Sequence, residues 1–269
     1  MLNRISLLAL LLAFLLMPLA SQAEPLRILT YNIRHGQGTD GKLDLERVAK
    51  VIRQVQPDLV ALNEVDKGVQ RSGQVDQPQK LAELTGLKSV FEKNIDYGGG
   101  EYGNAILSRL PITRHTNYPL PSMYDGEQRG MLVATVRLPD DSSLHFAATH
   151  FDSRRSDQER LASVRFIRQT IEQDFPDAPF LLAGDFNALP DSKVMRQIDE
   201  FWQVVPTTAT FPATEPKSRI DYICFRPLKG WRVLEAKVLE EPLASDHRPV
   251  LVVLQPITGE VENSQEGTE

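Results

Sequence analysis

The sequence predicts an α/β protein in which two mixed β-sheets pack face to face and helices cover their outer sides. Nine short runs rich in Val, Ile, Leu and Phe are bounded by Gly, Pro, Asn or Asp, a pattern typical of β-strands. Segments with helical periodicity are fewer and lie between only some of these runs, while short connections join the others. A sandwich of two sheets with outer helices accommodates both kinds of connection.

The strand-like runs extend through almost the whole chain. Their apolar residues are continuous or alternate with polar ones, and turn-forming residues separate them. We therefore expect strands at residues 26–33, 58–65, 103–109, 131–138, 144–151, 180–186, 219–225, 233–240 and 249–254.

Three helices are expected between these strands. The first ends before Pro57, the second begins at a capping-box pattern from Ser156 to Glu159, and the third follows Asp191. Each has apolar residues three or four positions apart, which gives it one apolar side. These residues are Leu45, Val48, Ile52 and Val55 in the first helix, Leu161, Val164, Ile167 and Ile171 in the second, and Val194 and Ile198 in the third.

Residues 1–23 have the pattern of a signal peptide. Arg4 precedes an apolar stretch from Ile5 to Leu16, and Ser21 and Ala23 occupy the small-residue cleavage positions. The stretch is shorter than the ~20 residues that a membrane span requires, which argues against an uncleaved anchor. We expect cleavage after Ala23 and an exported protein, periplasmic or secreted, without a transmembrane segment in its mature chain.

The mature chain is expected to hold one catalytic domain. Residues 24–256 contain no Gly-, Ser- or Pro-rich linker, and residues 257–269 form a polar, acidic tail that we expect to be disordered. Loss of Arg4 changes the formal charge from −6 to −7. No basic run is present to neutralise a nucleic-acid backbone, which disfavours nucleic acid as a partner. Cys224 is the single cysteine and is expected in the core.

Polar residues recur at or near the ends of the apolar runs. If the two sheets pack as proposed, these ends converge on one rim and form a cleft. Carboxylates, amides and histidines gathered in one cleft suit phosphate-ester chemistry assisted by a hard cation. The residues concerned are Asn32, Glu64, His150, Asp185, Asn187, Asp221, Asp246 and His247.

Each residue type has a physical reason to be there. Glu64 and Asn32 offer the oxygen ligands that Mg²⁺ prefers, with Mn²⁺ as an alternative. Asp185 can orient or deprotonate the attacking water. Taken singly, each residue also has an ordinary structural explanation, such as a turn-forming Asn or a half-buried imidazole. The interpretation therefore depends on the whole ordered set.

Roles for three further site residues follow from the same chemistry. Asn187 can donate an N–H group to a developing oxyanion, and Asp221 can hold His247 in one tautomer. No chemistry is assigned to the histidines that are left, which are His35, His115 and His145.

The ordered set resembles the endonuclease/exonuclease/phosphatase superfamily. The matching blocks are TYNIRHG, PDLVALNEVD, YGNAILSR, THFD, LLAGDFN, RIDYI and SDHRPVLVVL, which follow the order of that family. The resemblance implies a four-layer α/β/β/α sandwich. It also implies metal binding by Glu64, Asn32 and Asp246, catalysis by Asp185, Asn187, Asp221, His247 and His150, and substrate contacts from Asn104 and Arg129.

Arg34 departs from the pattern of the repair endonucleases in this family, which have an aspartate at that position. A cation at this position argues against repair-type nuclease activity and suits a site that binds a phosphate or an anionic head group. We therefore assign Arg34 to substrate binding. The inositol-phosphatase subgroup is also disfavoured, because EPKSRIDYI reproduces little of its signature.

The expected function is a Mg²⁺-dependent phosphodiesterase that acts on a lipid head group or another small phosphodiester, as a monomer. An exported nuclease is the alternative, and a phosphomonoesterase or a binding module without catalysis is less favoured. The candidate substrate loops are RHGQGTDGK, IDYGGGEY and residues 118–128, although Gly98–Gly100 fits an ordinary strand connection best.

Overall fold

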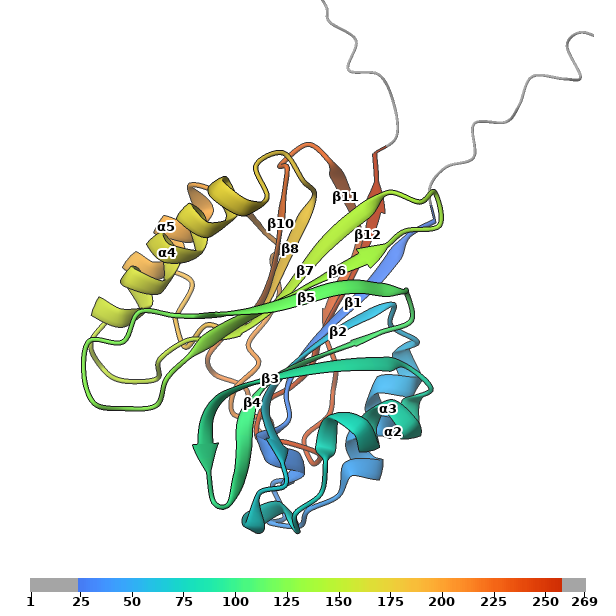
Figure 1. Cartoon of the computed structure of the whole chain (residues 1–269), viewed down its shortest axis with the longest axis vertical. Coiled ribbons are helices and arrows are strands. Elements are labelled where there is room, and N and C mark those ends of the chain that lie inside the picture. Colours follow the sequence, from blue (N-terminus) through green and yellow to red (C-terminus); the bar gives the residue numbers. More distant parts are fainter. Residues whose placement is uncertain (1–23, 258–269) are drawn as a thin grey trace, which may run out of the picture.

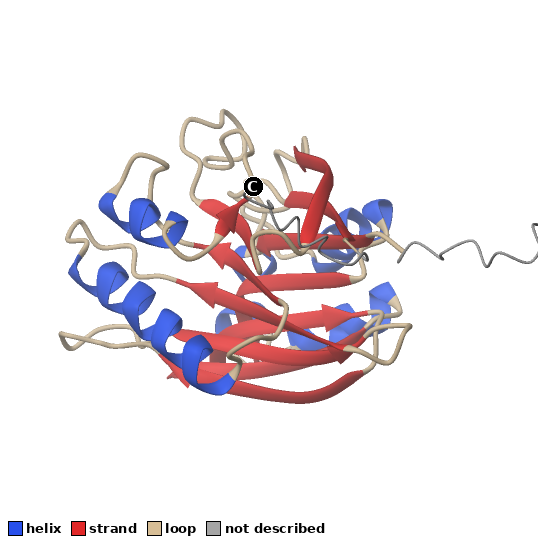
Figure 2. Cartoon of the chain, turned by 90° about the horizontal axis from the view of Figure 1, so that it is seen from above, coloured by secondary structure: helices blue, strands red, loops and turns tan. Residues whose placement is uncertain are grey.

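Two six-stranded sheets form the centre of the protein, and helices cover both outer sides (Figures 1 and 2). The computed structural model describes residues 24–257. The first sheet has the order β11-β12-β1-β2-β4-β3. Its strands are β1 (Leu26–Asn32), β2 (Leu59–Lys67), β3 (Lys88–Tyr97), β4 (Gly100–Ser108), β11 (Trp231–Val238) and β12 (Val250–Pro256).

The second sheet has the order β5-β6-β7-β8-β10-β9. Its inner face packs on that of the first sheet through apolar side chains such as Ile28, Phe146 and Ile223. The predicted four-layer α/β/β/α sandwich is confirmed. The strands are β5 (Ile112–Pro119), β6 (Gly130–Arg137), β7 (Ser143–His150), β8 (Phe180–Asp185), β9 (Gln203–Val204) and β10 (Asp221–Arg226).

Each sheet contains one parallel pair, and these pairs determine where the polar strand ends meet. β1 runs parallel to β2, with Asn32 opposite Asn63, and β7 runs parallel to β8, with His150 opposite Asp185. β10 is antiparallel to β8, so its first residue, Asp221, also lies opposite Asp185. Strand ends from both sheets therefore gather at one rim of the sandwich.

The helices form the two outer layers, which Figure 1 shows on opposite sides of the sheets. α2 (Leu45–Val55) and α3 (Gln77–Thr85) pack on the first sheet, and α4 (Gln158–Asp174) and α5 (Lys193–Asp199) pack on the second. Two 3₁₀ turns, η2 (Arg34–Gly36) and η3 (Gln70–Ser72), follow β1 and β2. None of the helices within residues 24–257 has the length and apolar character needed to cross a bilayer.

Most elements agree with the sequence expectations. The three predicted helices are present, and their inner residues Val48, Ile167 and Ile198 are buried. Cys224 is buried, as expected. The predicted signal peptide, and the tail apart from Ile257, lie outside the described residues.

The start of α4 differs from the prediction, whereas α5 begins directly after Asp191 and Ser192, as expected. The N-cap of α4 is Asp157, whose side chain makes no capping hydrogen bond. The expected capping box is not formed, since the Glu159 carboxylate accepts hydrogen bonds from Met123 N and Ser122 Oγ. Glu159 thereby holds the segment that precedes β6. At α5, the Ser192 side chain caps the helix by accepting a hydrogen bond from Met195 N.

Elements that the sequence did not reveal have weak apolar patterns. β3 and β5 are half-buried or exposed along their lengths, β3 carries four charged residues, and β5 is largely polar. α3 buries only Gln77, Pro78 and Leu81. Their positions depend on neighbouring elements, because local apolar periodicity is too weak to define them.

Candidate active site

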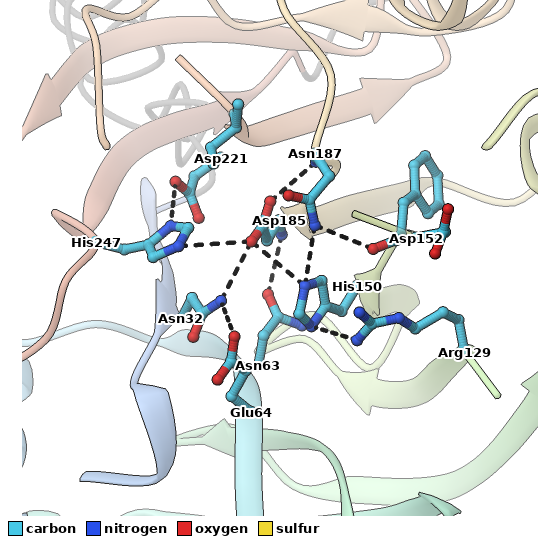
Figure 3. A network of polar contacts seen from close by, with 12 residues as sticks. Asn32, Asn63, Glu64, Arg129, His150, Asp152, Asp185, Asn187, Asp221 and His247 are labelled. Atoms are coloured by element: carbon cyan, nitrogen blue, oxygen red, sulfur yellow. Dashed lines mark hydrogen bonds and ion pairs between the residues drawn. The ribbon is translucent and has the colours of Figure 1, made fainter. Parts of the chain in front are cut away.

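A network of polar side chains occupies the rim where the strand ends meet (Figure 3). Asp185 lies at its centre, at the end of β8, with 2% of its surface exposed. Asn187 N donates to Asp185 Oδ1 at 2.9 Å, and Asn32 Nδ2 donates to Oδ2 at 3.2 Å. His150 Nε2 and His247 Nε2 lie 3.4 and 3.7 Å from Oδ2. This one carboxylate therefore contacts residues from both sheets.

An irregularity in β2 brings two consecutive side chains into the network. The register between β2 and β4 shifts between Leu62 and Val65, and Glu64 has a φ of 58°. Such a bulge re-aims side chains that would otherwise alternate between faces. Glu64 accepts a hydrogen bond from Asn32 Nδ2 at 3.0 Å, and Asn63 Oδ1 accepts one from Asp185 N at 3.0 Å.

Gly184 allows β7 and β8 to approach closely beside the site. A Cβ atom at this position would lie 1.8 Å from the carbonyl oxygen of Thr149, and the φ of 147° is unfavourable for other residues. The glycine in LLAGDFN is therefore required by packing. It sets the position of Asp185 relative to His150 in the neighbouring strand.

Burial dominates the electrostatics of Asp185. It raises the pKa of this carboxyl to about 7, although the positive charge of His247 acts in the opposite direction. The carboxyl group is thus poised to accept a proton near neutral pH, which suits a residue that activates or orients water.

His247 is held as a cation by two carboxylates. Its Nδ1 lies 3.0 Å from Asp221 Oδ2, which also accepts a hydrogen bond from Thr210 Oγ1 at 2.5 Å. Burial alone would lower the pKa of His247, but Asp221 and then Asp185 raise it to about 10. The imidazolium can therefore stabilise negative charge on a phosphoryl oxygen.

His150 is neutral and contacts polar groups through both ring nitrogens. Its Nδ1 lies 3.0 Å from Arg129 Nη1, and its Nε2 lies 3.1 Å from Asn187 Nδ2 and 3.4 Å from Asp185 Oδ2. Burial, followed by the charges of Arg129 and His247, lowers the pKa of His150 well below its usual value. Arg129 also forms a 2.5 Å ion pair with Glu127.

These residues open into a cleft of about 360 Å³. Side chains from several elements line it, including some that the sequence analysis did not single out. The lining consists of Glu64, Arg71, Ile95, Tyr97, Tyr102, Glu127, Arg129, His150, Ser153, Asp185, Asn187 and His247.

Five predicted residues lie outside that lining. Two of them, Asn32 and Asp221, contact lining residues through the hydrogen bonds described above. Asn104 is buried behind the lining, where Oδ1 accepts from Asn63 Nδ2 at 2.9 Å and Nδ2 donates to Gly130 O at 3.1 Å. In this position Asn104 orients Asn63, and its predicted contact with substrate stays a prediction. Arg34 forms a 3.5 Å ion pair with Asp246 beside the rim. Its predicted contact with substrate stays a prediction.

Sequence reasoning missed Asn63, Arg71, Tyr97, Tyr102, Glu127 and Thr210. Asn63 had a usable signal, because a second polar residue next to Glu64 interrupts a buried strand. Tyr97 and Tyr102 flank the glycine-rich connection in IDYGGGEY, and Glu127 lies in the predicted 118–128 segment. Arg71 and Thr210 come from stretches without an informative pattern.

The donor chemistry of the rim fits a hard divalent cation. Glu64 presents a carboxylate in the cleft, and the amide of Asn32 lies next to it. A 2.7 Å hydrogen bond from Ser245 Oγ to Asn32 O joins the loop that carries Asp246 to β1. Asp185, Asp221 and His247 form a second group whose possible ligand atoms lie within 4.8 Å. In that group the His247 ring is protonated, which makes it a poor metal ligand.

Known proteins share the sequence pattern and the fold of this chain. The model of the Endonuclease/Exonuclease/phosphatase family matches residues 29–247. The chain belongs to this family. The uncharacterised protein YbhP of Escherichia coli is 28% identical to it over 261 residues, which cover 87% of this chain and 98% of YbhP.

Solved structures of the family share the fold. An endonuclease/exonuclease/phosphatase from Beutenbergia cavernae has a TM-score of 0.69 and 26% identity, covering 86% of this chain and 72% of its own. The mannosyl-6-phosphatase Bt3783 of Bacteroides thetaiotaomicron has a TM-score of 0.70 and 20% identity, covering 85% and 99%. Enzymes of this family hydrolyse phosphoesters and generally depend on a divalent metal, so the chain is a phosphoester hydrolase of this family.

Proposed function

We propose that this chain is an exported, Mg²⁺-dependent phosphodiesterase that hydrolyses a small phosphodiester by direct attack of water at phosphorus. The observation that carries the proposal is the buried Asp185 carboxylate, which lies between a cationic His247 and a neutral His150 and borders the cleft. A base with a pKa near neutrality and an adjacent cation are what water attack on a phosphoryl group requires.

Asp185 orients the attacking water through Oδ2 and accepts its proton as the bond to phosphorus forms. Asn187 N and Asn32 Nδ2 hold the carboxylate in place. His247, kept protonated by Asp221, donates toward a phosphoryl oxygen that gains negative charge. His150 borders the same space, with its Nε2 3.4 Å from Asp185 Oδ2.

A divalent cation bound by Glu64, Asn32 and Asp246 would supply Lewis-acid stabilisation of the phosphoryl charge. The amide of Asn32 joins this group to the base, since its Nδ2 contacts both Glu64 and Asp185. Mn²⁺ has similar oxygen preferences and is the alternative metal.

The size and charge of the cleft favour a small substrate over nucleic acid. Its volume of about 360 Å³ is that of a small-molecule site. Glu64 and Glu127 offset the positive charges of Arg129 and Arg71 in the lining, and the whole chain has a formal charge of −6. A nuclease remains the alternative function. A phosphomonoesterase is the third, because the same network serves either ester and Bt3783 carries that activity in its name.

Export is part of the proposal and depends on the sequence of residues 1–23. Fractionation of cells that produce the full chain would place it in the periplasm or the medium, with its N-terminus at Glu24. Retention in the cytoplasm with an intact N-terminus would reject export.

The decisive test compares three substrates with Mg²⁺ and with chelator: bis(p-nitrophenyl) phosphate, plasmid DNA, and mixed phospholipids that include sphingomyelin. We expect metal-dependent hydrolysis of the first or the third, with DNA left intact. Rapid nicking of the plasmid would favour the nuclease. No activity on any of them would reject the phosphodiesterase and direct attention to phosphomonoesters.

A further inference from the structure

One end of the cleft is built from residues that the proposed reaction does not use. Arg71, in η3, lines this end together with Tyr97 at the end of β3 and Tyr102 in β4. Glu127 lines the same cleft and contacts the Arg129 side of the catalytic network. This end, which we call the Arg71 subsite, is continuous with the catalytic residues and can receive the part of a substrate beyond its reacting phosphate.

Arg71 is fixed in one orientation. Its Nε and Nη2 donate to the two oxygens of Asp66, both at 2.9 Å, and Asp66 is fully buried. The guanidinium carbon lies 4.6 Å from the ring centre of Tyr97 and 5.3 Å from that of Tyr102. A guanidinium held at one edge and packed against two rings loses little entropy when its remaining N–H groups bind a ligand.

Backbone contacts hold η3, which carries Arg71, against the connection between β3 and β4. Gln70 N donates to Gly98 O at 3.0 Å, which joins η3 to the connection between β3 and β4. A Cβ atom at Gly100 would lie 2.4 Å from the carbonyl carbon of Gly68. The glycine-rich IDYGGGEY segment is therefore a tight strand connection, as expected, and its function is to hold Tyr97 over Arg71.

The charges of the Arg71 subsite are balanced. Asp66 compensates Arg71, and Glu127 compensates Arg129. Nη1 of Arg71 makes none of the hydrogen bonds found within residues 24–257, and the Tyr97 side chain is 45% exposed. The subsite thus offers N–H donors, a carboxylate acceptor and an aromatic surface, but little net charge.

We propose that the Arg71 subsite binds a polyhydroxylated ring, such as a sugar or a cyclitol, that carries the phosphate to be hydrolysed. Ring hydroxyls can accept from Arg71 and donate to Glu127, while the apolar C–H face of the ring packs on Tyr97. A second anionic group fits less well, because Asp66 already neutralises Arg71. This inference depends on the proposed phosphoester hydrolysis and specifies its substrate class.

The experiment uses matched substrate pairs that differ only in the group expected in the Arg71 subsite. Glycerophosphoinositol is compared with glycerophosphocholine as a diester pair, and glucose 6-phosphate with glycerol 1-phosphate as a monoester pair. We expect kcat/KM to favour the ring compound by about tenfold or more in at least one pair, from a few added hydrogen bonds and one aromatic contact. The pairs also distinguish a cyclitol source from a sugar source.

Variants then test whether Arg71 and Tyr97 cause that preference. Tyr97→Ala removes an exposed ring, and Arg71→Lys keeps a charge beside Asp66 but loses the planar fork. Both are expected to bring the preference ratio close to one. Arg226→Lys is the matched control, because the Arg226 guanidinium also packs on an aromatic ring, 4.2 Å from the centre of Phe201. Arg226 is the last residue of β10 and lies opposite Phe180, at the end of these strands that is remote from the cleft. This variant should leave the ratio unchanged.

The outcomes separate the two proposals. If bis(p-nitrophenyl) phosphate is hydrolysed but neither pair shows a preference for the ring, the inference is wrong and the phosphodiesterase stands. A preference for 3-phosphoglycerate over glucose 6-phosphate would also overturn it, since the subsite would then select a second anion. Unchanged ratios in both variants, each with a wild-type melting temperature, would assign the preference to other residues. No hydrolysis of any of these substrates would reject the proposed function itself.

Discussion

Asp58 and Asp185 are buried carboxylates at opposite ends of the same sandwich, and their surroundings differ. Asp58, directly before β2, is 1% exposed and accepts hydrogen bonds from Arg27 N at 2.8 Å and Arg109 Nε at 2.7 Å. Asp185 is 2% exposed, has no arginine partner among the described residues, and its pKa is raised by burial. Asp58 is compensated by Arg109 and stabilises the fold. Asp185 has no such partner and can exchange a proton.

The largest expected effect comes from Asp185→Asn. The substitution preserves shape but removes the base, so kcat should fall by about 10³-fold, within the range for general-base catalysis. Metal-dependent hydrolysis of bis(p-nitrophenyl) phosphate measures it. Asp58→Asn is the matched control and should keep kcat within about twofold. A folded, active Asp185→Asn protein would contradict the assigned role.

Asp221→Asn tests whether the cationic state of His247 depends on its partner. Loss of the 3.0 Å contact should lower the pKa of His247 and reduce kcat/KM by about 10- to 100-fold, as for other orienting partners. Titration of the His247 ring by NMR, beside steady-state kinetics, checks both effects. A reduced rate with an unchanged His247 pKa would assign Asp221 to another role.

Asp58→Asn should affect stability where Asp185→Asn affects catalysis. It removes a charge that accepts hydrogen bonds from Arg27 and Arg109, so we expect a loss of about 2 kcal/mol in the free energy of unfolding. Denaturant unfolding measures this loss. If stability is unchanged, the Arg27–Asp58–Arg109 contacts do not hold that end of the sandwich together.

The smallest effect concerns pH in the metal-free protein. The Asp185 pKa of about 7 in the folded state exceeds the ~3.9 of an unfolded aspartate, so its contribution to stability is greatest below pH 4 and is lost as pH rises through 7. With chelator present, the melting temperature of Asp185→Asn relative to wild type should therefore increase from pH 5 to pH 8. A constant difference would mean that burial does not raise this pKa.

The same contrast explains what the sequence could predict. Asn32, Glu64 and Asp185 lie at the ends of strong apolar strands, and His247 lies just before one, so local pattern and family order located them together. Arg71 and Tyr97 depend on η3 and β3, whose positions are fixed by glycine contacts and a shared hydrogen bond and not by periodicity. The substrate end of the cleft was consequently less visible in the sequence than its catalytic end.

The antiparallel pairing of β1 with β12 has a practical consequence. Leu26 lies opposite Leu254, so both ends of the described chain emerge at the Asp58 end of the sandwich, while Asn32 reaches the catalytic rim. Seven residues of extended strand separate these ends by about 20 Å. A fusion partner or a surface linkage attached at Glu24 or Ile257 would therefore leave the cleft facing outward, which suits immobilised assays and display on particles.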